Sequence, residues 1–87
     1  MNYVPDFMPS CQKTIDKAIR KNSVLAKILF RKINEIIQNP HHYKPLRHNL
    51  AGERRVHILK SFVLSFRIDE TNKTVIFLKF GHHDKAY

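Results

Sequence analysis

The spacing of apolar residues changes halfway along this chain, and that change limits the folds open to it. Up to Gln38 the apolar residues recur every three or four positions, as they do along one side of an amphipathic helix. From Val56 onward they alternate with polar residues, as in strands that bury one face. A helical first part followed by a strand-forming second part predicts an α+β fold, with the helices covering one face of an antiparallel sheet.

Two helices are expected in the first part. The first begins at Ser10, a residue type that caps helix N-termini, and ends near Lys21. The second begins at Ser23, which is also a possible cap, and Pro40 stops it. Because the two segments nearly adjoin, we expect them to form an antiparallel hairpin.

Extended segments complete the predicted fold. Residues 2–8 form at best a short or edge strand, because Pro5 has no N–H to give to a sheet. Three strands around residues 55–58, 62–68 and 74–80 follow the helices with short links, which predicts an antiparallel meander. In the last strand, strict alternation would set Ile76, Leu78 and Phe80 opposite Val75, Phe77 and Lys79.

The same alternation separates an apolar face from a polar one. Val56, Ile58, Leu64, Phe66 and Ile68 share the face that the helices are expected to cover. The opposite, open face is predicted to carry Arg55, His57, Ser61, Ser65, Arg67 and Lys79. A basic sheet face of this kind is a plausible platform for RNA.

Size and charge narrow the class of protein. A chain of 87 residues makes one domain, residues 1–87, and it carries 16 Lys and Arg against 7 Asp and Glu. The net charge of +9 predicts a polyanion or an acidic masking protein as partner. Because it has one cysteine and no long apolar run, we expect no internal disulfide, no membrane span and a cytoplasmic location.

The most basic stretch and the histidines are the candidate site. Between His41 and Lys60 the chain offers these cations for phosphate: Lys44, Arg47, Arg54, Arg55 and Lys60. His57 would stand on the open face, where an imidazole can take or give a proton near neutral pH, although a strand histidine is often merely structural. No Cys-x-x-Cys or His-x-x-x-His spacing is present, so no metal or cofactor is expected.

Three motifs in the second half resemble, in order, those of a known family. They are LRHNLAG at residues 46–52, RRVHI at 54–58 and GHHDKAY at 81–87. Together with the layout of the whole chain, they are similar to the RelE/ParE superfamily of bacterial and archaeal toxins, and most of all to its YafQ-like branch of ribosome-dependent mRNA interferases.

The resemblance implies a RelE-like microbial RNase fold and a set of site residues. It places His48, His57 and His83 at the three active-site histidines and Tyr87 at the aromatic residue that closes the site. Arg67, like the cations above, is then a candidate for holding phosphate. Two positions depart from the pattern: Ser61 stands where the branch usually has aspartate, and Val63 where the superfamily often has arginine.

The activity that this resemblance implies is cleavage of mRNA on the ribosome without a metal, as the toxin of a type II toxin–antitoxin system. The implied partners are the ribosome, mRNA and an acidic RelB- or DinJ-like antitoxin, with which the toxin would form a hetero-oligomer. Two alternatives stay open. A ParE-like toxin inhibits DNA gyrase on the same layout, and a basic module could bind RNA or the ribosome without catalysis.

Overall fold

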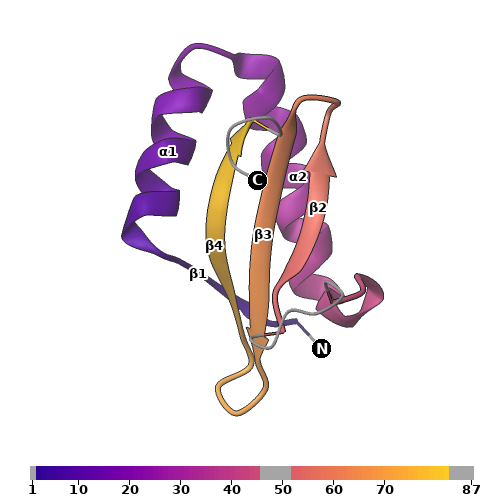
Figure 1. The fold of residues 1–87 in the computed structure, drawn as a ribbon. Coiled ribbons are helices and arrows are strands. Elements are labelled where there is room, and N and C mark those ends of the chain that lie inside the picture. Colours follow the sequence, from indigo (N-terminus) through magenta and orange to yellow (C-terminus); the bar gives the residue numbers. More distant parts are fainter. Residues whose placement is uncertain (1, 46–51, 83–87) are drawn as a thin grey trace.

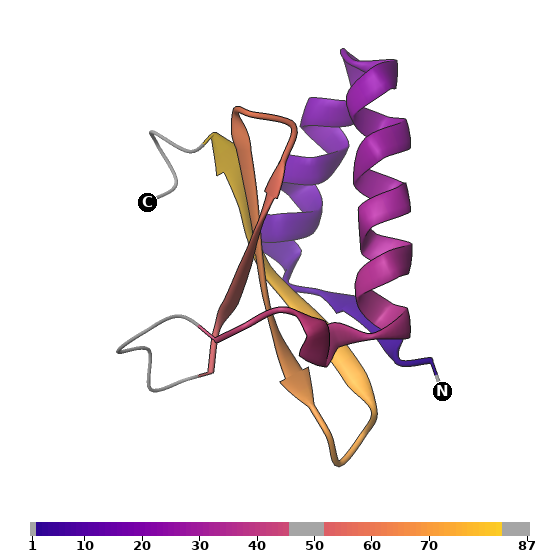
Figure 2. The ribbon, with the colours of Figure 1, turned by 90° about the vertical axis from the view of Figure 1, so that its right-hand side faces the viewer.

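Two helices lie against one face of a four-stranded sheet in the computed structural model, which describes residues 2–45 and 52–82 (Figures 1 and 2). The elements run in the order β1 (Val4–Phe7), α1 (Pro9–Arg20), α2 (Ser23–Gln38), the short 3₁₀ helix η1 (Pro40–His42), β2 (Arg54–Ile58), β3 (Phe62–Asp69) and β4 (Thr74–His82). The α+β fold, with its helical hairpin and later strands, is therefore confirmed. Within the described ranges, no helix is long and apolar enough to cross a membrane.

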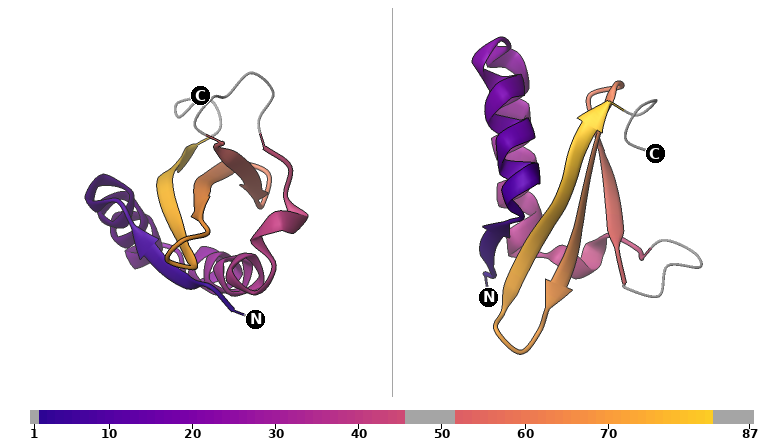
Figure 3. Two further views of the ribbon diagram at one scale, coloured as in Figure 1. Left: turned by 90° about the horizontal axis from the view of Figure 1, so that it is seen from below. Right: turned by 60° about the vertical axis from the view of Figure 1, so that its left-hand side comes forward.

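The sheet has the order β1-β4-β3-β2. Strands β2, β3 and β4 form the predicted antiparallel meander, while β1 pairs in parallel with β4 at the edge of the sheet. The edge position suits Pro5, which cannot donate to a neighbouring strand. Figure 3 shows β1 running beside β4 below the helices, so the first and last strands of the described chain are neighbours.

Both helices begin differently from the prediction. Met8 is the N-cap of α1, and Pro9 follows it at a position where the missing N–H and fixed φ of proline suit a helix start. The N-cap of α2 is Asn22, whose side-chain oxygen accepts a hydrogen bond from the backbone N–H of Leu25 at 3.0 Å. Ser10 and Ser23 are thus helical residues, and their predicted capping role is wrong.

The core lies between the helices and the sheet. Its buried residues are Cys11 and Ile15 of α1, Leu25, Leu29, Ile33 and Ile36 of α2, and Ile58, Leu64, Phe66, Val75, Phe77 and Phe80 of the sheet. Within the sheet, Phe77 of β4 stacks on its pairing partner Phe7 of β1, with ring centroids 4.9 Å apart. The helices therefore cover the face of β2 and β3 that alternation predicts.

Strand β4 does not alternate strictly. Ser65 pairs with Lys79, but the next residue, Phe66, pairs with Phe77, so Leu78 is an extra residue in β4. An insertion of this kind is a β-bulge, and it reverses the side on which later residues fall. Phe77 and Phe80 consequently both belong to the core, and the predicted alternation of β4 is wrong.

The neighbours Leu29 and Phe30 test this account of the core. Leu29 is completely buried, whereas Phe30 is 52% exposed. We expect Leu29→Ala to lower the free energy of unfolding by about 2–5 kcal/mol, because it leaves a cavity. Phe30→Ala should change it by roughly 0.5 kcal/mol or less. Urea unfolding of both variants makes the comparison, and equal losses would contradict the packing described.

Candidate functional site

A row of polar residues crosses the open face of the sheet. Arg55 on β2 pairs with Ser65 on β3, and Ser65 pairs with Lys79 on β4. Paired residues on adjacent strands point to the same face, and two strand spacings put the outer residues about 10 Å apart. The prediction that these three residues share one face is confirmed. In this row, one cation lies on each side of the Ser65 hydroxyl.

The residues at the centre of this open face are buried. Ser65 and its neighbour on the same face, Val63, are both completely buried. The Ser65 hydroxyl has no hydrogen-bond partner, although a buried hydroxyl normally needs one. Val63, which the sequence comparison with the family sets at an often basic position, is therefore expected to contribute packing and no charge to this face.

His57 and Arg67 lie on the same face and are exposed. His57 is two residues from Arg55 on β2 and pairs with Val63, while Arg67 is two residues beyond Ser65 on β3. The structure therefore brings an imidazole and three cations to one face of the sheet. Ser61, which was assigned to this face, lies in the exposed turn before β3.

Arg54 is directed differently from Arg55. It pairs with Phe66, a core residue, so it lies on the side of the sheet that the helices cover. One guanidinium nitrogen, Nη1, donates to the backbone oxygen of Tyr43, and its buried Nε has no partner. Arg54 thus ties the segment after η1 to β2, and the structure does not bring it together with Arg55.

The remaining predicted residues divide into two groups. Lys44 and Lys60 are exposed, and Lys60 lies in the turn between β2 and β3. Four others lie outside the described residues: Arg47, His48, His83 and Tyr87. The proposed set of three histidines is therefore represented within the described chain by His57 alone.

Glu70, in the turn between β3 and β4, collects three donors. Its carboxylate accepts hydrogen bonds from the hydroxyl of Tyr3 at 2.5 Å, from Nε2 of His41 at 2.7 Å and from Nζ of Lys73 at 2.9 Å. These donors, with the Tyr3 bond contributing most, lower the pKa of Glu70 to about 2. The cluster links the β3–β4 turn to Tyr3, which precedes β1, and to His41 in η1.

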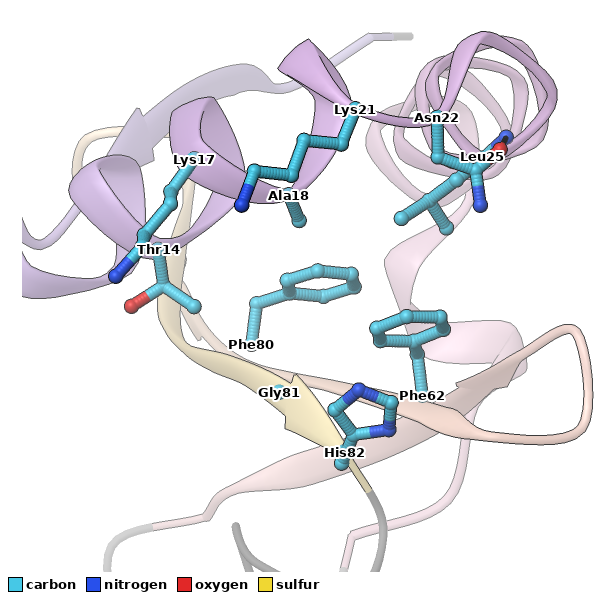
Figure 4. A pocket seen from close by; sticks show the side chains of 10 residues that line it. All are labelled: Thr14, Lys17, Ala18, Lys21, Asn22, Leu25, Phe62, Phe80, Gly81 and His82. Atoms are coloured by element: carbon cyan, nitrogen blue, oxygen red, sulfur yellow. Dashed lines mark hydrogen bonds between the residues drawn. The ribbon is translucent and has the colours of Figure 1, made fainter.

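A cavity lies on the other side of the sheet, between α1 and the end of β4 (Figure 4). Its volume is about 450 Å³, and its residues are Thr14, Lys17, Ala18, Lys21, Asn22, Leu25, Phe62, Phe80, Gly81 and His82. His82 is exposed, and its ring lies 4.6 Å from that of Phe62. Sequence reasoning missed this cavity, although the two-residue spacing of Phe80 and His82 places them on one side.

The sequence pattern described as the ParE toxin of the type II toxin–antitoxin system matches residues 6–87. The chain belongs to this toxin family. The resemblance to the RelE/ParE superfamily is thus confirmed, and the protein is the toxin of a type II toxin–antitoxin system.

Two archaeal proteins are similar to this toxin over most of their lengths. One, from Methanocaldococcus jannaschii, is named "Putative toxin RelE4" and is 52% identical over 85 residues, covering 98% of this chain and 90% of its own. An uncharacterized protein of Methanosarcina mazei is 43% identical over 72 residues, covering 83% and 84%.

Solved structures share the fold. The RelBE2 toxin–antitoxin complex of Mycobacterium tuberculosis contains a chain with a TM-score of 0.75 and 25% identity, covering 95% of this toxin and all of that chain. A metal-bound toxin of Helicobacter pylori reaches a TM-score of 0.78 at 20% identity, covering 98% and 99%. The intact RelBE complex of E. coli gives 0.72 at 21%, covering 92% and 95%. The predicted RelE-like fold is therefore confirmed.

Within the described part of the toxin, neither a reactive thiol nor a cluster of metal ligands indicates a catalytic site. Among these residues, no group of three His, Cys, Asp or Glu side chains could hold a metal ion. Burial raises the pKa of the Cys11 thiol to about 11, so it stays protonated near neutral pH.

The Glu70 cluster predicts how the toxin responds to acid. Because the folded pKa of Glu70 is about 2 and its ordinary value is 4.5, its stabilising contribution is full above pH 4.5. That contribution is lost as the pH falls from 4.5 towards 2. We expect the difference in unfolding free energy between the wild type and Glu70→Gln to shrink across this range in urea unfolding experiments.

Glu35→Gln is the matched control, since within residues 2–45 and 52–82 the Glu35 carboxylate forms one ion pair, with Lys32 at 3.3 Å. The difference in unfolding free energy between Glu35→Gln and the wild type should vary less with pH than the difference for Glu70→Gln. A difference for Glu70→Gln that stays constant from pH 4.5 to 2 would contradict the role given to the three donors.

Proposed function

We propose that this toxin is an endoribonuclease that cuts mRNA on the ribosome. The observation that supports the proposal is the shared face of Arg55, His57 and Lys79, with Arg67 beside them. A proton carrier among cations is the equipment that cleavage of a phosphodiester needs. The name of the M. jannaschii relative, which refers to RelE, agrees with this choice.

The reaction uses the 2′-hydroxyl of the RNA as the nucleophile. A base removes the proton of that hydroxyl, and its oxygen attacks the adjacent phosphorus. The bond from phosphorus to the 5′-oxygen then breaks, and an acid gives this leaving oxygen a proton. The products are a 2′,3′-cyclic phosphate and a free 5′-hydroxyl, so no water, metal or cofactor enters this step.

The residues of the toxin divide these tasks by their chemistry. His57, His48 and His83 carry the protons, with His83 as one of the acid–base pair, and Tyr87 orients or stacks on the RNA. Arg55 and Arg67 stabilise the charge that develops on the phosphoryl oxygens. The exposed cations Lys44 and Lys60, together with Arg47, bind flanking phosphates. Arg54, which lies on the helix side, contributes through its hold on the segment that precedes β2.

The partner that we propose is an acidic antitoxin of the RelB or DinJ type, in a hetero-oligomer with the toxin. The net charge of +9 favours such a partner because a polyanionic protein neutralises the same field that attracts RNA. The complexes formed by the M. tuberculosis and E. coli proteins are consistent with it.

A second candidate is inhibition of DNA gyrase. It is favoured by the family pattern itself, which is named after the ParE toxin. RNA cleavage needs a positioned proton carrier, and His57 offers an exposed imidazole on the face that carries Arg55 and Lys79. We therefore rank mRNA cleavage first.

His57→Ala tests the mRNA cleavage proposal. Loss of a positioned proton carrier should lower the cleavage rate by about 10² to 10⁴. The rate is measured as new RNA ends on translating ribosomes, mapped by primer extension. His42→Ala is the control, because His42 is exposed in η1 and touches only the edge of the Tyr43 ring among the described ring contacts. Full cleavage by His57→Ala, or by His83→Ala, would refute the role given to that residue.

A supercoiling assay with purified gyrase separates the two candidates. We expect no inhibition by the wild-type toxin at concentrations that cut ribosome-bound mRNA completely. Inhibition of supercoiling without new RNA ends would establish the ParE-like activity instead. Binding to ribosomes with neither effect would indicate the non-catalytic module.

A further inference from the structure

The cavity between α1 and the end of β4 has an apolar floor made of packed rings. The rings of Phe62 and Phe80 stack with centroids 5.3 Å apart and planes 5° from parallel, and His82 lies against Phe62 on the same side (Figure 4). Ala18 and Leu25 close the cavity from the helices. A hollow of about 450 Å³ is far larger than one water molecule needs, and it lies in the size range of pockets that bind ligands.

Cations supply the charge at the rim of this cavity. Lys17 and Lys21 project from α1, on the side of the cavity that faces the ring pair in Figure 4, and His82 stands at the far side. None of the ten lining residues is aspartate or glutamate. An apolar floor beneath a cationic rim suits a partner that offers an apolar side chain between carboxylates.

We infer that this cavity holds a large aliphatic side chain from an acidic segment of the antitoxin. Carboxylates on either side of that side chain pair with Lys17 and Lys21. The inference rests on the proposed antitoxin partner, and it adds the surface and the chemistry by which the partner is held. It does not depend on the toxin being a nuclease.

The packing of the rings favours a protein segment over RNA. A nucleobase binds by stacking on an open aromatic face. Phe80 is only 5% exposed, and Phe62 is already in contact with the rings of Phe80 and His82. An aliphatic side chain needs only the edges of these rings and the methyl group of Ala18, which is partly exposed in the cavity.

The cavity gives the antitoxin a binding site that is separate from the proposed catalytic face. Phe62 and Phe80 belong to the side of the sheet that the helices cover, whereas Arg55 and Lys79 lie on the other side. An antitoxin seated here binds tightly without touching His57. Charge changes in the cavity should then alter antitoxin affinity and leave mRNA cleavage by the free toxin unchanged.

Charge reversal on α1 tests the inference with a matched pair of double variants. Lys17→Glu/Lys21→Glu reverses the rim, and Lys13→Glu/Arg20→Glu reverses two exposed cations of the same helix that do not line the cavity. The net charge changes equally in both. With the purified antitoxin of the same system as the probe, we expect calorimetry to give a Kd raised about 30-fold or more for the rim variant and about 3-fold or less for the control.

Ala18→Leu tests the apolar part, since its side chain would fill the cavity while keeping a good helix former. We expect it to raise Kd about 10-fold, and to do so equally at low and high salt, unlike the rim variant. Circular dichroism and cleavage of ribosome-bound mRNA show that each free variant is folded and active.

Three results would overturn the inference. The first is an equal loss of antitoxin affinity in the two double variants, which would indicate a general electrostatic attraction. The second is an unchanged affinity of Ala18→Leu for the antitoxin. The third is a rim variant that loses binding to RNA in place of binding to the antitoxin. A wild-type toxin that binds no antitoxin would overturn it together with the proposed partner. A toxin that binds antitoxin as described but cuts no mRNA would leave this inference standing and refute only the nuclease.

Discussion

The β-bulge at Leu78 is the constraint on which both faces of this toxin depend. It lets Phe77 and Phe80 enter the same core although three positions separate them in a strand. With the register shifted there, Lys79 stays opposite Ser65 on the open face, and His82 comes round beside Phe62. If the same sequence alternated strictly beyond Phe77, without a bulge, Phe80 and His82 would lie on the open face, and the cavity beside α1 would lose its floor.

The two sides of the sheet consequently carry different chemistry. One side has an imidazole and cations around a covered centre, and the other has an apolar hollow under two lysines. Both sides are positive because the chain has few acidic residues. One of these, Glu70, already accepts hydrogen bonds from three donors. A positive field attracts any polyanion, so the two partners that we propose, RNA and an acidic antitoxin, would be distinguished by the shape of separate sites.

The sequence predicted what local periodicity and residue chemistry decide. The alternation of β2 and β3 placed Arg55, His57 and Ser65 correctly, because each strand there has one apolar and one polar face. In β4 Ile76, Phe77 and Leu78 are three consecutive apolar residues, so alternation held no information about which of them is the extra residue. The helix starts were missed because Asn22 and Ser23 are both good caps, and only the folded geometry chooses between them. The cavity depends on how α1 packs against the end of β4, which no local pattern contains. The roles of His48, His83 and Tyr87 stay predictions, since these residues lie outside the described chain.

The parallel pairing of β1 with β4 has a consequence for the order of events in the cell. Strand β4 is an inner strand of the sheet, yet among the described strands it is the last to be synthesised. Until β4 is made, β1 has no strand to pair with, and β3 lacks one of its two partner strands. The helical hairpin then has only part of the sheet to pack against. Contacts between such distant parts of a chain form late in folding. The described fold of the toxin is thereby incomplete until β4 has been synthesised, so an antitoxin made earlier is present before the toxin can fold.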